Sequence, residues 1–192
     1  LALDRGAVVR VGATNAHAFD SEDGFTTSRV SVMSEDGEGN VWFVAASDVL
    51  RVHGDQVQRI GSNEGVPPTG SAWVTADSQR RMWIARGSQV GVMHEGRWKA
   101  VLSLDSAQLR LLGARSGGLW ITTTSRVLRF VEGREPEDLG RLPEHATVRV
   151  MLEDSSGALW IGTGEQGLWR LRQKHLEQVT VSHPEILSLA ED

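Results

Sequence analysis

A tryptophan recurs along this chain at nearly constant intervals. Trp42, Trp83, Trp120 and Trp160 are separated by 41, 37 and 40 residues. The flanking residues recur as well, because an apolar residue precedes each tryptophan and a fixed position lies six residues before it, occupied in turn by Asp36, Asp77, Ala114 and Asp154. Self-similarity at a fixed period is the signature of a repeat architecture. The chain is therefore built from copies of one small structural unit.

Each copy contains three or four short apolar runs rich in Val, Ile, Leu and Trp, separated by Gly, Asp, Ser and Asn. This spacing is typical of consecutive antiparallel strands. The segment Asp-x-x-Gly between the first two runs favours a hairpin turn, since the Asp side chain bonds the backbone ahead of it and Gly accepts positive φ. Four strands in about 40 residues is the period of a propeller blade. The sequence predicts an all-β fold, a β-propeller of four-stranded antiparallel blades.

The repeat predicts that residues 1–192 form a single propeller segment composed of successive blades. We expect four full blades, at 29–70, 71–107, 108–147 and 148–185, and partial blades at 1–28 and 186–192. The incomplete ends predict a fragment of a larger ring whose end blades expose apolar faces, and hence self-association or covering by missing blades of the same chain. A helix is the alternative for residues 99–112, which lack Gly and Pro.

Composition excludes several classes of function. The chain has no Cys, which excludes zinc-thiolate sites and cysteine nucleophiles. Its net charge is −5, so it lacks the basic footprint of a nucleic-acid-binding protein. No run of 18 apolar residues is present, which predicts no membrane contact by this segment.

One string in the last full copy carries a family resemblance. Residues 153–163 read Glu-Asp-Ser-Ser-Gly-Ala-Leu-Trp-Ile-Gly-Thr and are followed by Gly-Leu-Trp-Arg at 167–170. This string resembles the two-component regulator propeller repeat, and the likeness is weakest at 110–130, where Ala114 replaces the Asp. In that family such repeats build the extracytoplasmic sensor regions of hybrid histidine kinases, whose ligands are often oligosaccharides. The resemblance implies a ligand-binding, non-enzymatic segment in the periplasm or another extracytoplasmic location, with any kinase activity residing elsewhere.

Aromatic and basic residues that depart from the repeat are the candidate ligand contacts. Trp73, Trp98 and Trp169 are out of phase with the repeated tryptophans. Trp73 stands in a predicted first strand, the strand nearest the axis of a propeller, and Arg110 stands in the same slot of a later copy. A buried Arg usually has a carboxylate partner, and one without it is an anion-binding candidate. An oligosaccharide or another small ligand is the expected partner.

The residues that are in phase are expected to be structural. They comprise the four repeated tryptophans, which we expect to fill the space between blades, and the turn residues Asp36, Asp77 and Asp154. The turn at 36–40 is acidic but lacks the spacing of a calcium loop. The string Gly-x-Gly-x-x-Gly at 162–167 leads into a predicted strand, whereas a dinucleotide site requires a helix. We expect no cofactor, no metal and no catalytic residue.

Two other functions remain open at this point. The string Gly-Asn-Val-Trp-Phe at 39–43 also resembles propeller lyases that open streptogramin rings, although their metal and catalytic His cannot be assigned to particular positions of this chain. The other alternative is a non-catalytic scaffold that binds a protein partner through blade faces or strand edges.

Overall fold

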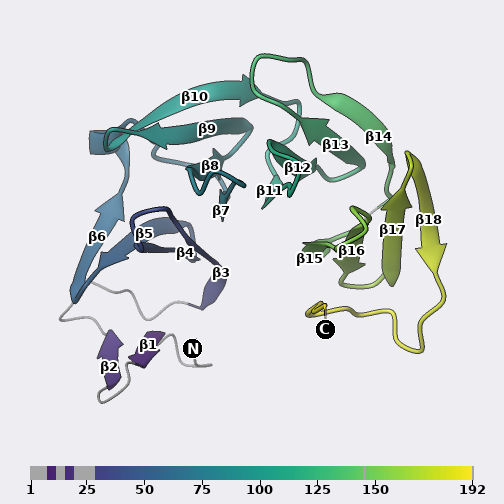
Figure 1. The fold of residues 1–192 in the computed structure, drawn as a ribbon, viewed down its shortest axis with the longest axis horizontal. Helices are drawn as coiled ribbons and strands as arrows, with labels where there is room; N and C mark the ends of the chain where they lie inside the picture. The colour runs from purple at the N-terminus through teal and green to yellow at the C-terminus, as the bar shows by residue number, and fades with distance from the viewer. Residues whose placement is uncertain (1–7, 12–15, 20–28, 145, 192) are drawn as a thin grey trace. The chain divides into compact units, whose positions relative to one another are not determined.

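The computed structural model describes residues 8–11, 16–19, 29–144 and 146–191 (Figure 1). The chain separates into two compact units, one made of residues 1–76 and 80–103 and the other of residues 77–79 and 104–192. Most of the predicted partial blade 1–28, together with Asp192 of the predicted partial blade 186–192, lies outside the described residues.

In the first unit, the described residues form two four-stranded antiparallel sheets and one hairpin. The hairpin pairs β1 (Val8–Val11) with β2 (Ala16–Phe19). The first sheet consists of β3 (Val30–Glu35), β4 (Val41–Ala45), β5 (Asp48–His53) and β6 (Gln56–Ile60). After a 3₁₀ turn at Ser62–Glu64, the second sheet consists of β7 (Ala72–Ala76), β8 (Met82–Arg86), β9 (Gln89–His94) and β10 (Arg97–Ser103).

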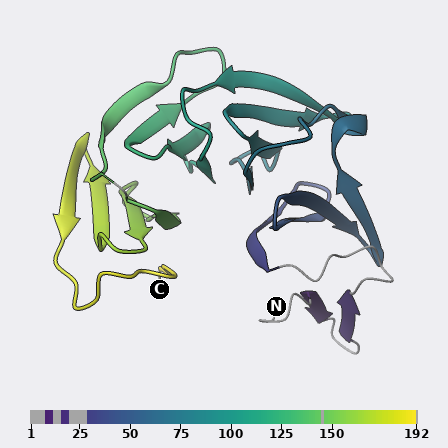
Figure 2. The same cartoon turned by 180° about the vertical axis from the view of Figure 1, so that it is seen from behind.

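The second unit repeats this plan. One sheet consists of β11 (Arg110–Gly113), β12 (Leu119–Thr122), β13 (Arg126–Phe130) and β14 (Glu137–Arg141). The other consists of β15 (Val148–Glu153), β16 (Leu159–Thr163), β17 (Leu168–Arg172) and β18 (His175–Val179). In every four-stranded sheet the strands pair in chain order, as both views show (Figures 1 and 2). The all-β prediction is confirmed.

The alternative of a helix at 99–112 is wrong. Residues 97–103 form β10, which pairs with β9, and residues 110–113 form β11, which pairs with β12. The absence of Gly and Pro leaves a helix possible, but ladder hydrogen bonds to neighbouring strands outweigh so weak a local preference. A bulge between Ala100 and Leu102 keeps β10 in register with β9.

Apolar side chains pack between the two sheets of each unit. In the first unit, Trp42 and Val44 of β4 share a buried cluster with Met82 and Ile84 of β8. In the second unit, Trp120 of β12 shares one with residues that include Leu159 and Ile161 of β16. The second strands are nearly continuous apolar runs because both of their faces are covered. A twisted four-stranded sheet has two apolar faces, and stacking on a neighbouring copy buries one of them.

Candidate functional site

The repeated Asp and Trp form one hydrogen-bonded element. The indole N–H of Trp42 donates to Oδ2 of Asp36 at 2.7 Å, and that of Trp160 donates to Asp154 at 2.7 Å. Each Asp also accepts backbone N–H groups from its own turn, at 2.9 Å from Asn40 and at 2.9 Å from Ala158. The spacing of six residues thus lets one carboxylate close the turn and orient the tryptophan of the following strand.

The third copy keeps this interaction although its Asp is replaced by Ala114. The indole N–H of Trp120 donates to Oε2 of Glu153 at 2.9 Å, and the backbone N–H of Arg115 donates to the same oxygen at 2.7 Å. Glu153 belongs to β15 of the neighbouring sheet and is buried. The carboxylate that is missing from one repeat is therefore supplied by the next.

The C-terminal segment makes a matching contact one repeat later. The backbone N–H of Ser155 donates to Oε1 of Glu191 at 2.6 Å. Ser155 follows its turn Asp as Arg115 follows Ala114, and Glu191 stands in the fifth copy where Glu153 stands in the fourth. The side chain of Arg115 reaches both, bonding the Glu153 carbonyl at 3.1 Å and the Glu191 carboxylate at 2.9 Å. The same kind of contact, from a backbone N–H to a glutamate of the next copy, therefore recurs between successive copies within the second unit.

An arginine lies over each of the four repeated tryptophans. In three copies this arginine is the direct cross-strand partner of the tryptophan in the third strand, as Arg51 is for Trp42 and Arg129 is for Trp120. Arg170 pairs with Trp160 in the same way, with its guanidinium carbon 5.4 Å from the ring centre. The sequence analysis missed this feature, although Arg recurs nine or ten residues after three of the tryptophans.

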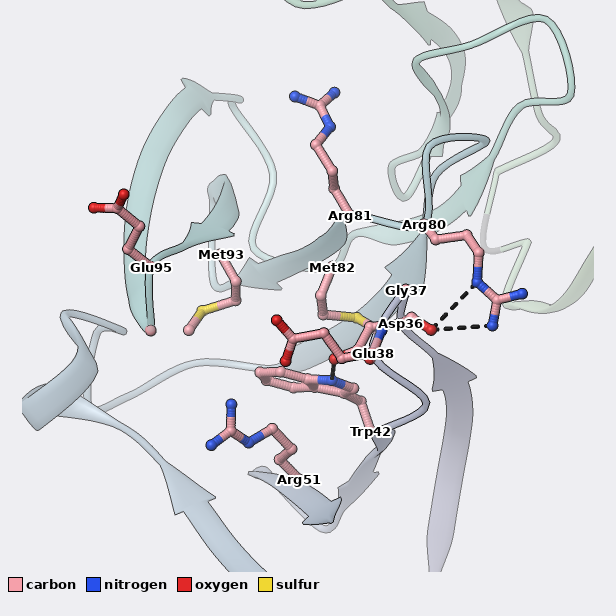
Figure 3. Close-up of a pocket in the computed structure, with 11 residues that line it drawn as sticks. Asp36, Gly37, Glu38, Trp42, Arg51, Arg80, Arg81, Met82, Met93 and Glu95 are labelled. Atoms are coloured by element: carbon pink, nitrogen blue, oxygen red, sulfur yellow. Dashed lines mark hydrogen bonds between the residues drawn. The ribbon is translucent and has the colours of Figure 1, made fainter.

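A cavity of about 290 Å³ lies in the first unit, where the turns of its two four-stranded sheets meet (Figure 3). Trp42, Met82 and Met93 give it an apolar wall, and Arg51 lies on one side of the indole ring. Charged and glycine residues of the surrounding turns complete the lining, namely Asp36, Gly37, Glu38, Arg80, Arg81, Glu95 and Gly96. Carboxylates and guanidinium groups thus surround a small apolar surface.

Asp36 is ionised in this cavity. Burial would raise the pKa of Asp36, but hydrogen bonds from the Asn40 and Trp42 side chains and from the turn backbone lower it below its ordinary value. Arg80 is held against the same turn, because its guanidinium donates to the Asp36 carbonyl at 3.0 Å and to Glu35 at 2.6 Å. Glu38 and Glu95 are more exposed carboxylates at the rim. The cavity is suited to binding a small polar molecule that has an apolar face.

None of the four predicted ligand residues lines this cavity. Trp98 belongs to β10, is only 9% exposed in the buried cluster between the sheets, and donates its N–H to the Ile84 carbonyl at 3.3 Å. Trp73 lies in the first strand β7, as predicted, and is half-buried.

The other two candidates lie apart from each other in the second unit. Trp169 of β17 packs against the buried cluster and donates its N–H to the Gln166 carbonyl at 2.9 Å. Gln166 lines another cavity, of about 360 Å³, together with residues 178–181 and Pro184. Arg110 lies in the first strand β11 beside a much smaller space of about 20 Å³. Within the second unit, Arg110 and Trp169 therefore lie beside different spaces.

The described residues contain no group of three or more His, Asp or Glu side chains placed to hold a metal ion. Within the same part of the chain, no helix has the length and apolar character needed to cross a membrane.

Residues 142–165 match the family described as the two-component regulator propeller. No curated protein sequence is significantly similar to the chain. Several solved structures share its fold. The extracellular domain of the putative hybrid two-component system BT4673 from B. thetaiotaomicron matches with a TM-score of 0.68 and 14% identity, over 98% of this chain and 28% of that one.

Two further structures show the same fold. The extracellular domain of BT3049 from B. thetaiotaomicron matches with a TM-score of 0.60 and 18% identity, over 88% of this chain and 26% of that one. Virginiamycin B lyase from Staphylococcus aureus matches with a TM-score of 0.72 and 14% identity, over 94% of this chain and 64% of that one. The chain thus spans about a quarter of the two extracellular domains and under two thirds of the lyase. It has the β-propeller fold, and the recurring Asp–Trp unit is a two-component regulator propeller repeat at 142–165.

Proposed function

We propose that this chain, a β-propeller that carries a two-component regulator propeller repeat, is a ligand-binding segment of the sensor region of a two-component signalling protein. The family match at 142–165 carries the proposal, because the matched family is described by its place in two-component regulators as well as by its propeller fold. The likeness to the extracellular domains of BT4673 and BT3049 supports it. In this proposal the segment lies outside the cytoplasm and binds its ligand without chemical conversion.

The cavity beside Trp42 is the proposed ligand site. A saccharide is the proposed ligand, because a sugar ring has an apolar face suited to Trp42 and the methionines, and hydroxyls suited to the surrounding carboxylates and guanidinium groups. The cavity volume of about 290 Å³ sets the scale at one or two sugar rings.

Thermal denaturation of the chain with a panel of oligosaccharides tests this proposal. A ligand at 100 times its dissociation constant stabilises the folded state by about 2.7 kcal/mol, which is a measurable rise in Tm. The variants Glu38→Gln and Glu95→Gln change the cavity rim and should weaken the response, whereas Glu135→Gln, at an exposed position of the second unit, should not. A panel that leaves the Tm unchanged would count against the saccharide, and a response that all three variants share would count against the cavity.

The structural likeness to virginiamycin B lyase favours a second candidate, a propeller lyase. A lyase would open a cyclic ester in the presence of a divalent metal, which chromatography of the substrate detects. If the chain opens a cyclic ester and no saccharide raises its Tm, the lyase function replaces the sensor function proposed above.

Self-association of the chain is a further proposal, from the exposed apolar side chains of Met33 and Leu187. Sedimentation velocity over a range of concentrations tests it directly. A single monomeric species at all concentrations would contradict it.

A further inference from the structure

One pair of facing residues departs from the repeat. Arg110 of β11 lies directly opposite Thr122 of β12. The corresponding pairs in the other four-stranded sheets are Val32 with Val44, Trp73 with Ala85, and Val150 with Gly162. Opposite residues of an antiparallel pair project from the same face with their Cβ atoms about 5 Å apart. Only the sheet β11–β14 places two hydrogen-bonding side chains at this position among the described sheets.

The hydroxyl of Thr122 makes no hydrogen bond with the described residues. Thr122 is 1% exposed, and its Oγ1 atom is buried. Thr163 of β16, another fully buried threonine, donates its hydroxyl proton to the Gly167 carbonyl at 2.9 Å. A buried hydroxyl without a partner loses its hydrogen bonds to water and gains none in return, so native structures rarely retain one without a reason.

A small space adjoins this pair. It has a volume of about 20 Å³ and is lined by Arg110, Thr122, Thr124, Thr147 and neighbouring residues. A cavity of about 10 to 15 Å³ accommodates one water molecule. The space therefore fits a single oxygen atom, with Arg110 and threonine side chains around it.

The electrostatics of this place favour negative charge. Burial lowers the pKa of Arg110, and the positive charge of Arg149 on the neighbouring strand β15 lowers it further. Two like charges near a buried site repel each other, and an anion between or beside them would reduce that repulsion. Arg110 donates an N–H to the Leu109 carbonyl at 3.3 Å.

We infer that the space between Arg110 and Thr122 binds one oxygen of an oxyanion, a carboxylate or a phosphate. The Thr122 hydroxyl and a guanidinium N–H of Arg110 both donate to that oxygen. Charge-assisted bonds of this kind are short and strong, and the planar guanidinium suits both groups. The inference does not depend on the sensor role or on a saccharide ligand, because it concerns the other unit of the chain.

Titration of the whole chain with sodium acetate and with sodium phosphate tests the site, with sodium chloride at matched ionic strength as the reference. We expect acetate, phosphate or both to raise the Tm and to give a binding isotherm by calorimetry. The response to acetate or to phosphate identifies which group the site accepts. Chloride should raise the Tm by less than the effective oxyanion, and an equal effect of all three salts would overturn the inference.

Three variants locate the effect. Thr122→Val has nearly the same shape without the hydroxyl and should raise the dissociation constant at least tenfold, whereas Thr122→Ser keeps the hydroxyl and the response. Thr163→Val is the matched control, because it removes a hydroxyl that is already satisfied; it should lower the Tm without changing the oxyanion response. If Thr122→Val does not fold, Arg110→Gln carries the same expectation. Wild-type affinity in Thr122→Val or in Arg110→Gln would overturn the proposed site.

Discussion

The indole N–H of Trp120 donates a hydrogen bond to the carboxylate of Glu153, 33 residues further along the chain and in the neighbouring sheet. In two other copies the tryptophan bonds the Asp of its own turn, as Trp42 does with Asp36. The same chemical contact therefore holds a turn to its own strand in one copy and joins two sheets in another. Removing it should have different consequences in the two places.

Glu153→Ala should destabilise the second unit by about 2 to 3 kcal/mol. The substitution leaves the Trp120 and Arg115 N–H groups without their charged acceptor, and bonds to charged groups contribute more than neutral ones. Urea denaturation followed by tryptophan fluorescence measures the change. Glu135→Ala, at an exposed position of the same unit, is the control and should change stability by less than about 0.5 kcal/mol, as is usual for surface sites.

Restoring the Asp of the third copy should compensate for the loss of Glu153. Ala114→Asp alone should destabilise, because it places a second carboxylate beside the buried Glu153. The double variant Ala114→Asp with Glu153→Ala recreates the arrangement of Asp154 and Trp160 and should recover stability relative to Glu153→Ala. A double-mutant cycle in urea gives the coupling free energy. Simple additivity of the two losses would show that the carboxylates are not interchangeable.

Asp154 should make stability fall at acid pH. Hydrogen bonds from Trp160 and Ser156 lower the pKa of Asp154 from 3.8 to about 2. The folded state thus holds the proton less tightly than the unfolded state, so the contribution is complete above about pH 4 and is lost as the pH falls through about 2. Unfolding free energies measured between pH 2 and 5 should depend less on pH in Asp154→Asn. An unchanged pH dependence in Asp154→Asn would contradict this role of Asp154.

The arginines over the tryptophans should differ in their contributions. Arg129 lies 5.1 Å from the centre of the Trp120 ring and also donates to the carbonyls of Leu119 and Phe130, at 3.1 and 2.8 Å. Arg51 lies 5.7 Å from the Trp42 ring, and its guanidinium bonds the exposed Gln58 side chain. Arg129→Ala should therefore cost about 2 kcal/mol and Arg51→Ala about 0.5 to 1 kcal/mol.

Arg129→Lys separates charge from geometry in that comparison. A lysine keeps the positive charge but lacks the planar fork that reaches several carbonyls. We expect it to recover less than half of the loss seen in Arg129→Ala, by urea denaturation. Full recovery would mean that charge over the ring is sufficient.

The periodic residues of the sequence determined the fold class and the strand order. A Trp six residues after an Asp, inside a run of apolar residues, requires a turn followed by a buried strand, and both requirements are local in the chain. For that reason the strands at 41–45, 82–86, 119–122 and 159–163 could be predicted without coordinates. The prediction that Trp73 and Arg110 stand in first strands follows from the same register.

Only the tertiary structure decided which residues of different copies meet. Three features depend on the stacking or pairing of segments that are distant or out of phase in the sequence. They are the hydrogen bond from Trp120 to Glu153 in place of a turn Asp, the cavity beside Trp42, and the unsatisfied hydroxyl of Thr122. Periodicity identifies what the copies have in common, because local propensity repeats with the sequence. Burial, charge and hydrogen-bond satisfaction at a particular place depend on the neighbouring sheet, and those are the properties that distinguish a site from a repeat.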